Sequence, residues 1–307
     1  MKYESTASYS KSKFSLVKIK NKIYIKKKPN KIDEREFQSI QKQNNFIPFK
    51  VNNYDVIAAK IISKKKFIKK NKYYYIEFFR GKSGQEILLT GNKQEIEILK
   101  NFLNEYFFKK FNLNKIRLRN LILLKKKIST LKKNIKVNKR KNFKKVFSFI
   151  SKSLNKKNFT FEENFCHGDL TLSNIIVNLK TKKIILIDFL QSYDDNIMQD
   201  ISKIYQEFVF MWSARYLKNT DSLRSKIVYE KILNFNFFKR LNNKLESSLK
   251  LEFLVTILRI IPYIKKNDDL TLEWIENSLT DINIEDDNNI QVLHDSPFFS
   301  IILILEQ

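Results

Sequence analysis

Three polar side chains near the middle of the chain have the types and spacing to carry out chemistry together. Asp169 and Asn174 lie at the start of a short apolar run, 175–177, and Asp188 ends a second run, 184–187. A lysine-rich turn joins the runs, which predicts a hairpin whose outer ends meet. Mg2+ prefers oxygen ligands of this kind, and a reacting hydroxyl needs a carboxylate to accept its proton, so the spacing indicates Mg-assisted phosphoryl transfer. The alternative interpretation is three turn-forming residues at strand ends.

Two motifs in this stretch resemble a known family. HGDLTLSN at 167–174, followed by LIDF at 186–189, is similar to the kinase-like phosphotransferase family that includes aminoglycoside and choline kinases. The segments HGDLTLSNII, LIDFLQS and QDISKIYQ are especially similar to bacterial members of that family, some of them found among surface-polysaccharide genes. The spacing also fits the protein-kinase catalytic loop, in which an Asp precedes an Asn by five positions and a metal-binding Asp follows.

The resemblance implies a role for each polar residue of these motifs. Asp169 would orient and deprotonate the acceptor hydroxyl, while Asn174 and Asp188 would hold Mg2+ against the nucleotide phosphates. His167 would support the catalytic loop, and Asp200 would brace that loop through its backbone.

The same resemblance implies a small amino-terminal lobe with a loop over the phosphates, a strand lysine and a helical glutamate. No glycine precedes Gly81, so Thr6, Ala7 and Ser8 would replace the usual glycines of that loop. Backbone groups of the hinge at 76–79, which includes Glu77 and Phe79, would meet adenine. A buried strand is the alternative interpretation of this hinge.

Two lysines compete for the phosphate-binding position. If the isoleucines of their strand are buried, alternation places Lys26 on the opposite, cleft side, which favours Lys26. Family members written V-R-K would instead place the lysine at Lys27. The carboxylate partner is expected to be Glu36, with Glu34 as the alternative. An exposed strand charge is the competing interpretation for either lysine.

Hydrophobic periodicity predicts the elements that position these residues. Alternation predicts a hairpin of 14–20 and 22–28 about an Asn21-Lys22 turn, and Asp33 is the expected cap of a helix over 33–43. Further strands are expected over 51–62 and 72–79, and helices over 95–108, 222–234, 239–258 and 272–279. In the family such late helices cover the acceptor pocket, which makes Trp212, Arg215 and Trp274 candidate acceptor-site residues; plain packing is the alternative.

Composition excludes several classes of protein. The 307 residues are 43% hydrophobic, which excludes a disordered polyelectrolyte, and one cysteine with two histidines excludes a zinc site of the Cys/His kind. No apolar run reaches the roughly 18 residues of a membrane span, and the first residues lack the apolar centre of a signal peptide. We expect a soluble cytoplasmic protein with no membrane span.

The net charge of +27 has two interpretations. A polyanionic partner such as nucleic acid is one, but only nine of the 59 basic residues are arginine, and arginine is the preferred reader of phosphates. We favour the composition bias of an AT-rich genome. Between Tyr106 and Phe161 there is no carboxylate at all, which predicts a solvated basic face or, alternatively, a cationic wall for an anionic acceptor.

Together these features predict an α+β, two-lobed protein-kinase-like fold. Residues 1–79 would form a small antiparallel-sheet lobe that binds nucleotide, and residues 80–307 a mostly helical lobe with the catalytic loop and the acceptor site. The expected function is Mg2+-dependent transfer of the γ-phosphoryl group of ATP or GTP to a hydroxyl of a small molecule, such as a sugar or glycan precursor.

Two other functions compete with this one. The first is a catalytically degenerate kinase-fold module that binds nucleic acid or anionic surfaces through the basic segment 109–157. The second is a protein kinase acting on Ser or Thr. Against the second, no A-P-E element follows IDF, and 190–200 is too short for a long activation segment.

Overall fold

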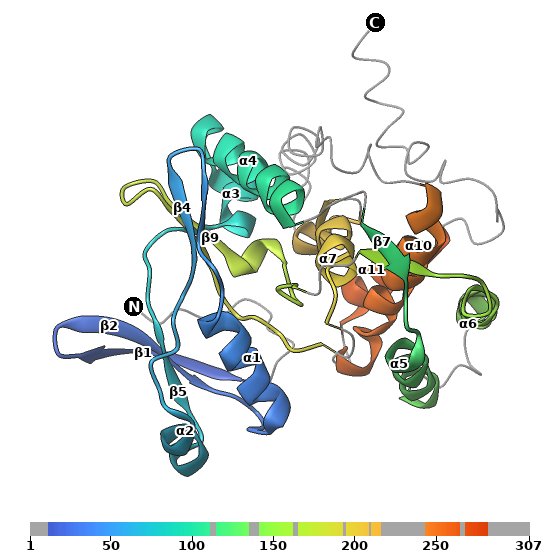
Figure 1. Cartoon of the computed structure of the whole chain (residues 1–307), viewed down its shortest axis with the longest axis horizontal. Coiled ribbons are helices and arrows are strands. Elements are labelled where there is room, and N and C mark those ends of the chain that lie inside the picture. The colour runs from blue at the N-terminus through green and yellow to red at the C-terminus, as the bar shows by residue number, and fades with distance from the viewer. Residues whose placement is uncertain are drawn as a thin grey trace, which may run out of the picture. The chain divides into compact units, whose positions relative to one another are not determined.

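The computed structural model describes residues 12–110, 115–134, 141–161, 165–192, 195–208, 210–215, 243–264 and 268–281. The described chain is α+β, with three small sheets and more helix than strand, so the predicted class is confirmed at this level (Figure 1). Backbone packing groups it into two compact units, of which the first holds described residues 12–109, 166–192 and 195. Such grouping does not define a nucleotide-binding lobe, so the boundary expected after Phe79 stays a prediction.

The first sheet is antiparallel and contains the amino-terminal hairpin. Its strand order is β1 (Lys13–Ile19), β2 (Lys22–Lys28) and β5 (Tyr74–Glu77). Lys20 and Asn21 form the hairpin turn, with φ of 45° and 63°. Two consecutive positive φ values match the right-handed twist of the flanking strands. The hairpin prediction is confirmed, with the turn one residue earlier than expected.

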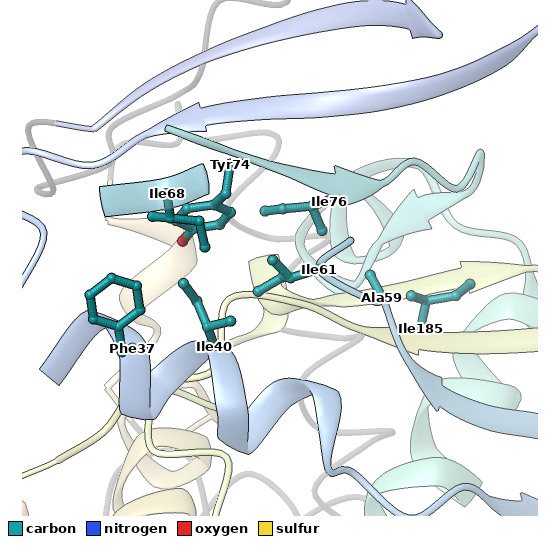
Figure 2. Close-up of a cluster of buried hydrophobic side chains, with 8 residues drawn as sticks. All are labelled: Phe37, Ile40, Ala59, Ile61, Ile68, Tyr74, Ile76 and Ile185. Carbon is teal, nitrogen blue, oxygen red and sulfur yellow. The ribbon is translucent and has the colours of Figure 1, made fainter. Parts of the chain in front are cut away.

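Helix α1 (Glu34–Asn44) follows the hairpin and packs on the interior of the first unit. Asp33 caps it by accepting a hydrogen bond of 3.1 Å from the amide of Glu36, as predicted. Its apolar face enters a buried cluster that also takes residues from α2 (Lys65–Asn71), β5 and β10 (Lys183–Leu186). Figure 2 shows the members of this cluster: Phe37, Ile40, Ala59, Ile61, Ile68, Tyr74, Ile76 and Ile185. Burial of one large apolar side chain contributes about 1.5–3 kcal/mol, which fixes α1 firmly.

A second sheet joins strands that lie far apart in the sequence. The predicted hairpin of 175–177 and 184–187 is confirmed as antiparallel β9 and β10, and β10 also pairs in parallel with β4, aligning Ile185 with Ile57. Ile184, Ile185 and Leu186 are fully buried, which suits a central strand. The strand order is β3 (Phe49–Val51), β4 (Tyr54–Ala58), β10 (Lys183–Leu186), β9 (Ile175–Asn178) and β6 (Lys82–Ser83). The early strands, expected in one sheet, are therefore divided between two.

The rest of the first unit is helical. A capping box of Ser83 and Glu86 begins α3 (Gly84–Thr90), and α4 (Lys93–Lys110) includes the predicted helix over 95–108. A short 3-10 helix, η2 (Leu172–Asn174), leads directly into β9. This turn carries one of the predicted site residues, Asn174.

The second unit is built around α10 (Asn243–Leu258), which packs against other helices and a strand of this unit. Helices expected over 239–258 and 272–279 are found as α10 and α11, whereas the one expected over 222–234 lies outside the described residues. None of the described helices has the length and apolar character needed to cross a bilayer. The remaining elements are β7 (Ile116–Leu118), α5 (Ile122–Asn134), α6 (Lys141–Ser153), β8 (Phe159–Phe161), α7 (Met198–Phe208), η3 (Trp212–Ala214), η4 (Ile261–Tyr263) and α11 (Asp269–Asp281).

Candidate functional site

A buried lysine of the first unit lies between two carboxylates. The ammonium of Lys27 is 2.5 Å from Asp188 Oδ1 and 3.8 Å from Glu36 Oε1. The lysine side chain is 10% exposed, whereas the side chain of Asp188 is 41% exposed. Burial by itself would lower the pKa of Lys27, but the charges of Asp188 and Glu36 outweigh it and raise that pKa. Lys27 therefore stays protonated beside a carboxylate that remains open to solvent.

The structure places Lys27, and not Lys26, at this position. Ile25 and Lys27 lie on the same face of β2, and Ile25 packs against the buried cluster. Lys26 lies on the other face, where its ammonium is 3.9 Å from the ring centroid of Tyr73. The alternation argument that favoured Lys26 fails because the lysine that meets the carboxylates continues the apolar face.

Glu36 is the carboxylate of α1 that lies near Lys27, as expected, and a tyrosine orients it. The hydroxyl of Tyr74 donates a 2.6 Å hydrogen bond to Glu36 Oε1. Burial, and then the charge of Glu36, raises the pKa of Tyr74, so the phenol remains a donor. Glu34, the alternative partner, instead lies 3.4 Å from Lys65 at the surface. Sequence analysis missed Tyr74, although its place two residues before buried Ile76 was a usable signal.

Asp169 and Asn174 hold one another at the start of β9. The side-chain amide of Asn174 donates to the carbonyl of Asp169 at 2.8 Å and to its carboxylate at 3.4 Å. The carbonyl of Asn174 accepts a 3.1 Å bond from the amide of Ile187, the residue before Asp188. Asp169 also adds to the field that raises the Lys27 pKa. The predicted residues therefore gather at the paired ends of β9 and β10, as the hairpin argument requires.

His167 supports this loop through both ring nitrogens. Its Nε2 lies 2.9 Å from the carbonyl of Ile187, and its Nδ1 accepts from the amide of Asp169 at 3.3 Å. A carbonyl can only accept and an amide N–H can only donate, so the ring is neutral with its proton on Nε2. Burial lowers the pKa of His167 to about 4. His167 has the predicted supporting position and is not a free acid or base.

Unusual backbone conformations occur on both sides of the site. Gly168 has a φ of 86°, and a Cβ at this position would lie 2.0 Å from the carbonyl oxygen of Leu190. Only glycine fits this turn. Asp188 itself has a φ of 60°, a left-handed conformation that costs on the order of 1–3 kcal/mol and is concentrated at functional sites.

The donor set suits a cation that brings ligands of its own. Among the described residues, no group of three or more His, Cys, Asp or Glu side chains is placed to hold a metal ion. Asp188 offers a partly exposed carboxylate, and Asn174 offers its amide oxygen, because its nitrogen is committed to Asp169. Zinc and calcium sites need more protein ligands than this, whereas Mg2+ usually takes one or two and keeps waters or phosphates.

The remaining predicted nucleotide contacts lie in or beside the first sheet, or outside the described part. Glu77 ends β5, where its amide donates to the carbonyl of Lys60 at 2.9 Å and its carboxylate accepts from the amide of Lys60 at 3.2 Å. Phe79 packs against the buried cluster. Thr6 and Ser8 lie outside the described residues, so the phosphate loop stays a prediction.

The candidate acceptor residues form one cluster within the second unit. The rings of Trp212 and Trp274 are 4.8 Å apart in a T-shaped arrangement, and the Arg215 guanidinium lies 3.5 Å from the Trp212 ring centroid. Arg215 also donates to the carbonyl of Trp212 at 2.7 Å, and Trp274 donates to the carbonyl of Phe210. These bonds give the cluster a packing role, and its acceptor role stays a prediction. Asp200 is fully buried on α7, and its bracing role likewise stays a prediction.

Comparison with other proteins adds no assignment: no protein-family model matches the chain, and a search of curated proteins finds no relative.

Proposed function

We propose that the chain is a phosphotransferase of a kinase-like fold, which moves the γ-phosphoryl group of ATP or GTP to a hydroxyl of a small molecule. The single observation that carries this proposal is the buried Lys27 between Glu36 and the half-exposed Asp188. Phosphoryl transfer of this kind needs a lysine held by a helical glutamate and an aspartate for the metal. The order of hairpin, lysine, capped helix and later Asp-Asn-Asp set supports the two-lobed kinase-like fold expected from the sequence.

The apolar face next to Lys27 supports binding of a nucleotide base. Phe14 pairs directly with Lys27 and Leu16 with Ile25, and paired residues point to the same face of the sheet. Phe14, Leu16 and Ile23 are about two-fifths exposed, at 40%, 44% and 40%. A base lying on this face would bury apolar surface while its phosphates approach Lys27.

The chain's own groups have separate tasks in this proposal. Asp169 accepts the proton of the acceptor hydroxyl, and Asn174 keeps that carboxylate in place through its amide hydrogens. Lys27 brings positive charge to the phosphates, where charge develops during transfer. Glu36 keeps Lys27 oriented when Asp188 is engaged elsewhere. Asp188 and Asn174 would hold Mg2+, which supplies charge neutralisation at the phosphates.

An acceptor screen tests the proposal. Purified chain with ATP or GTP and Mg2+ would be offered sugars, amino sugars, aminoglycosides and choline-like alcohols, and a lysate protein fraction would test the protein-kinase alternative. The proposal expects nucleotide consumption that depends on one small-molecule class and is lost in Asp169→Asn. Failure of every acceptor class, together with no Mg2+-dependent nucleotide binding, would contradict it.

A basic binding module is the second candidate function. The observation that favours it is the exposure of lysines on α5 and α6 in a stretch of sequence without carboxylates: Lys125, Lys126, Lys132, Lys133, Lys144, Lys145 and Lys152. Against base recognition, Arg119 is buried on Glu252. A salt-dependent shift of DNA or RNA at physiological ionic strength, without nucleotide hydrolysis, would favour this candidate.

A further inference from the structure

Helix α1 has a polar face with no role in the account so far. Four of its residues lie on one side of the helix, because they are spaced by four, three and one positions: Arg35, Ser39, Lys42 and Gln43. They hydrogen-bond to main-chain groups of 189–191, just after Asp188. Arg35 Nε donates to the Gln191 carbonyl at 2.7 Å, Ser39 Oγ accepts from the Gln191 amide at 2.7 Å, Lys42 Nζ donates to the Leu190 carbonyl at 2.9 Å and Gln43 Oε1 accepts from the Phe189 amide at 3.2 Å.

These bonds replace the partners that a sheet or helix would supply. Residues 189–192 have no regular secondary structure, and main-chain groups that leave water need hydrogen-bond partners. The amide of Leu190 adds a 3.0 Å bond to the carbonyl of His167. The stretch after Asp188 is therefore held by α1 on one side and by the loop before Asp169 on the other.

Lys42 connects α1, the stretch after Asp188 and the loop before Asp169 through one ammonium group. Besides Leu190, it contacts the carboxylate of Asp195 and lies 3.6 Å from the sulfur of Cys166. Cys166 in turn donates to Asp195 at 3.2 Å. The Lys42 side chain is only 9% exposed, so these partners take the place of water around its ammonium group.

We infer that α1 positions the residues of the candidate site relative to one another, with Lys42 as its central positioning residue. This inference rests on the proposed function of the site. The same rigid helix carries Glu36, which meets Lys27, and the polar face that holds the chain after Asp188. Loss of the Lys42 ammonium should therefore displace Asp188 relative to Lys27 and Asp169, although Lys42 touches none of the reacting groups.

Hydrogen exchange at residues 189–191 tests the inference independently of catalysis. Lys42→Met keeps the side-chain length but removes the charge, and we expect exchange of these amides to rise about tenfold or more. Ser39→Ala should raise exchange of Gln191, and Lys42→Arg should restore most of the protection. Gln41→Ala, on the exposed side of α1, is the matched control and should leave exchange unchanged.

Kinetics then separate this inference from the proposed function. For an active chain, we expect Lys42→Met to lower kcat/KM for the nucleotide about tenfold or more, because a displaced Asp188 would hold the Mg2+ of the nucleotide less well. Asp195→Asn in the same background should add little. Faster exchange in a chain without any transfer activity would support the positioning role of α1 and reject the proposed function. Unchanged exchange at 189–191 in folded Lys42→Met would overturn the inference; if that variant does not fold, the same result in Ser39→Ala would overturn it.

Discussion

Two buried ion pairs, one in each unit, differ in how completely their carboxylates are enclosed. In the second unit, Arg119 Nη2 lies 2.6 Å from Glu252 Oε2, with side-chain exposures of 2% and 0%. In the first unit, Lys27 lies 2.5 Å from Asp188, whose side chain is 41% exposed, and has Glu36 as a second partner at 3.8 Å. Arg119 and Glu252 are closed to any ligand, whereas Asp188 can change partners.

This difference is the reason for proposing a functional role for Lys27 and a structural one for Arg119. A fully enclosed pair has a large desolvation cost and is strongly destabilising to break, because the remaining charge has no solvent. A lysine with a spare carboxylate and an open neighbour can exchange one contact for another at little cost. A buried charge alone therefore does not support the proposal of a site, whereas a solvent-exposed partner carboxylate does.

The largest expected effect is on the chemistry at the open site. Asp169→Asn should lower phosphoryl transfer by about 10²–10⁴-fold, because the acceptor hydroxyl loses its proton acceptor. Nucleotide binding should persist, since the substitution keeps the main-chain carbonyl that accepts the 2.8 Å bond from Asn174 and leaves Lys27 and Asp188 unchanged. Single-turnover transfer and equilibrium binding, measured on the same preparation, check this; equal transfer by variant and wild type would reject Asp169 as the base.

At the closed pair the effect should be on stability. Arg119→Met leaves Glu252 buried without its charge partner and should lower the free energy of unfolding by about 3–5 kcal/mol. Combining Arg119→Met with Glu252→Leu should recover most of that loss. Urea denaturation measures the stability of both variants. An Arg119→Met variant as stable as wild type would show that Glu252 is not left buried without a charge partner.

The two neighbouring lysines of β2 provide a matched test of the open pair. Lys27→Met should lower transfer by about 10²–10³-fold, because a preorganised charge at the phosphates is removed. Lys26→Met should change transfer less than about threefold, since Lys26 lies on the opposite face over Tyr73, where a surface cation–π contact contributes only about 0.5–1 kcal/mol. A larger loss in Lys26→Met than in Lys27→Met would reverse the assignment.

A smaller effect is expected from pH, through the closed environment of His167. The folded pKa of about 4 is below the ordinary 6.5, so between these values the unfolded chain binds more protons than the folded chain. Stability is therefore fully present above pH 6.5 and is lost as pH falls toward 4, by about 2 kcal/mol at pH 5.

Replacement of the ring isolates this contribution from that of the carboxylates. In His167→Gln, the difference in unfolding free energy between pH 7.5 and pH 5 should be about 2 kcal/mol smaller than in wild type. Urea denaturation at the two pH values gives this difference for each protein. The same pH difference in both proteins would mean that the buried ring is not what titrates.

Local pattern was enough to predict the parts of the site that neighbouring residues determine. The β1–β2 hairpin, the Asp33 cap and the β9–β10 hairpin each depend on alternation or capping within a few residues. Because a hairpin brings its ends together by geometry, the meeting of Asp169, Asn174 and Asp188 followed from spacing.

Contacts between distant residues could not be predicted in this way. Lys27 is 161 residues from Asp188 in the sequence. The rule that a strand lysine faces away from the apolar side does not consider a carboxylate that a distant segment places on that side. The parallel pairing of β4 with β10 likewise has no local signal. The polar face of α1 follows from the spacing of its residues in the sequence. The irregular main chain that it contacts, 189–191, does not.

Mg2+-dependent nucleotide binding is the most direct test of the site. Calorimetric titration with ATP would be made for wild type and Asp188→Asn, each with Mg2+ and with EDTA. Wild type should bind at least about tenfold more tightly with Mg2+, and Asp188→Asn should lose that difference while remaining folded. Wild type that binds no nucleotide, or an Asp188→Asn variant with the full Mg2+ dependence, would contradict a metal-assisted phosphotransfer site at Lys27 and Asp188.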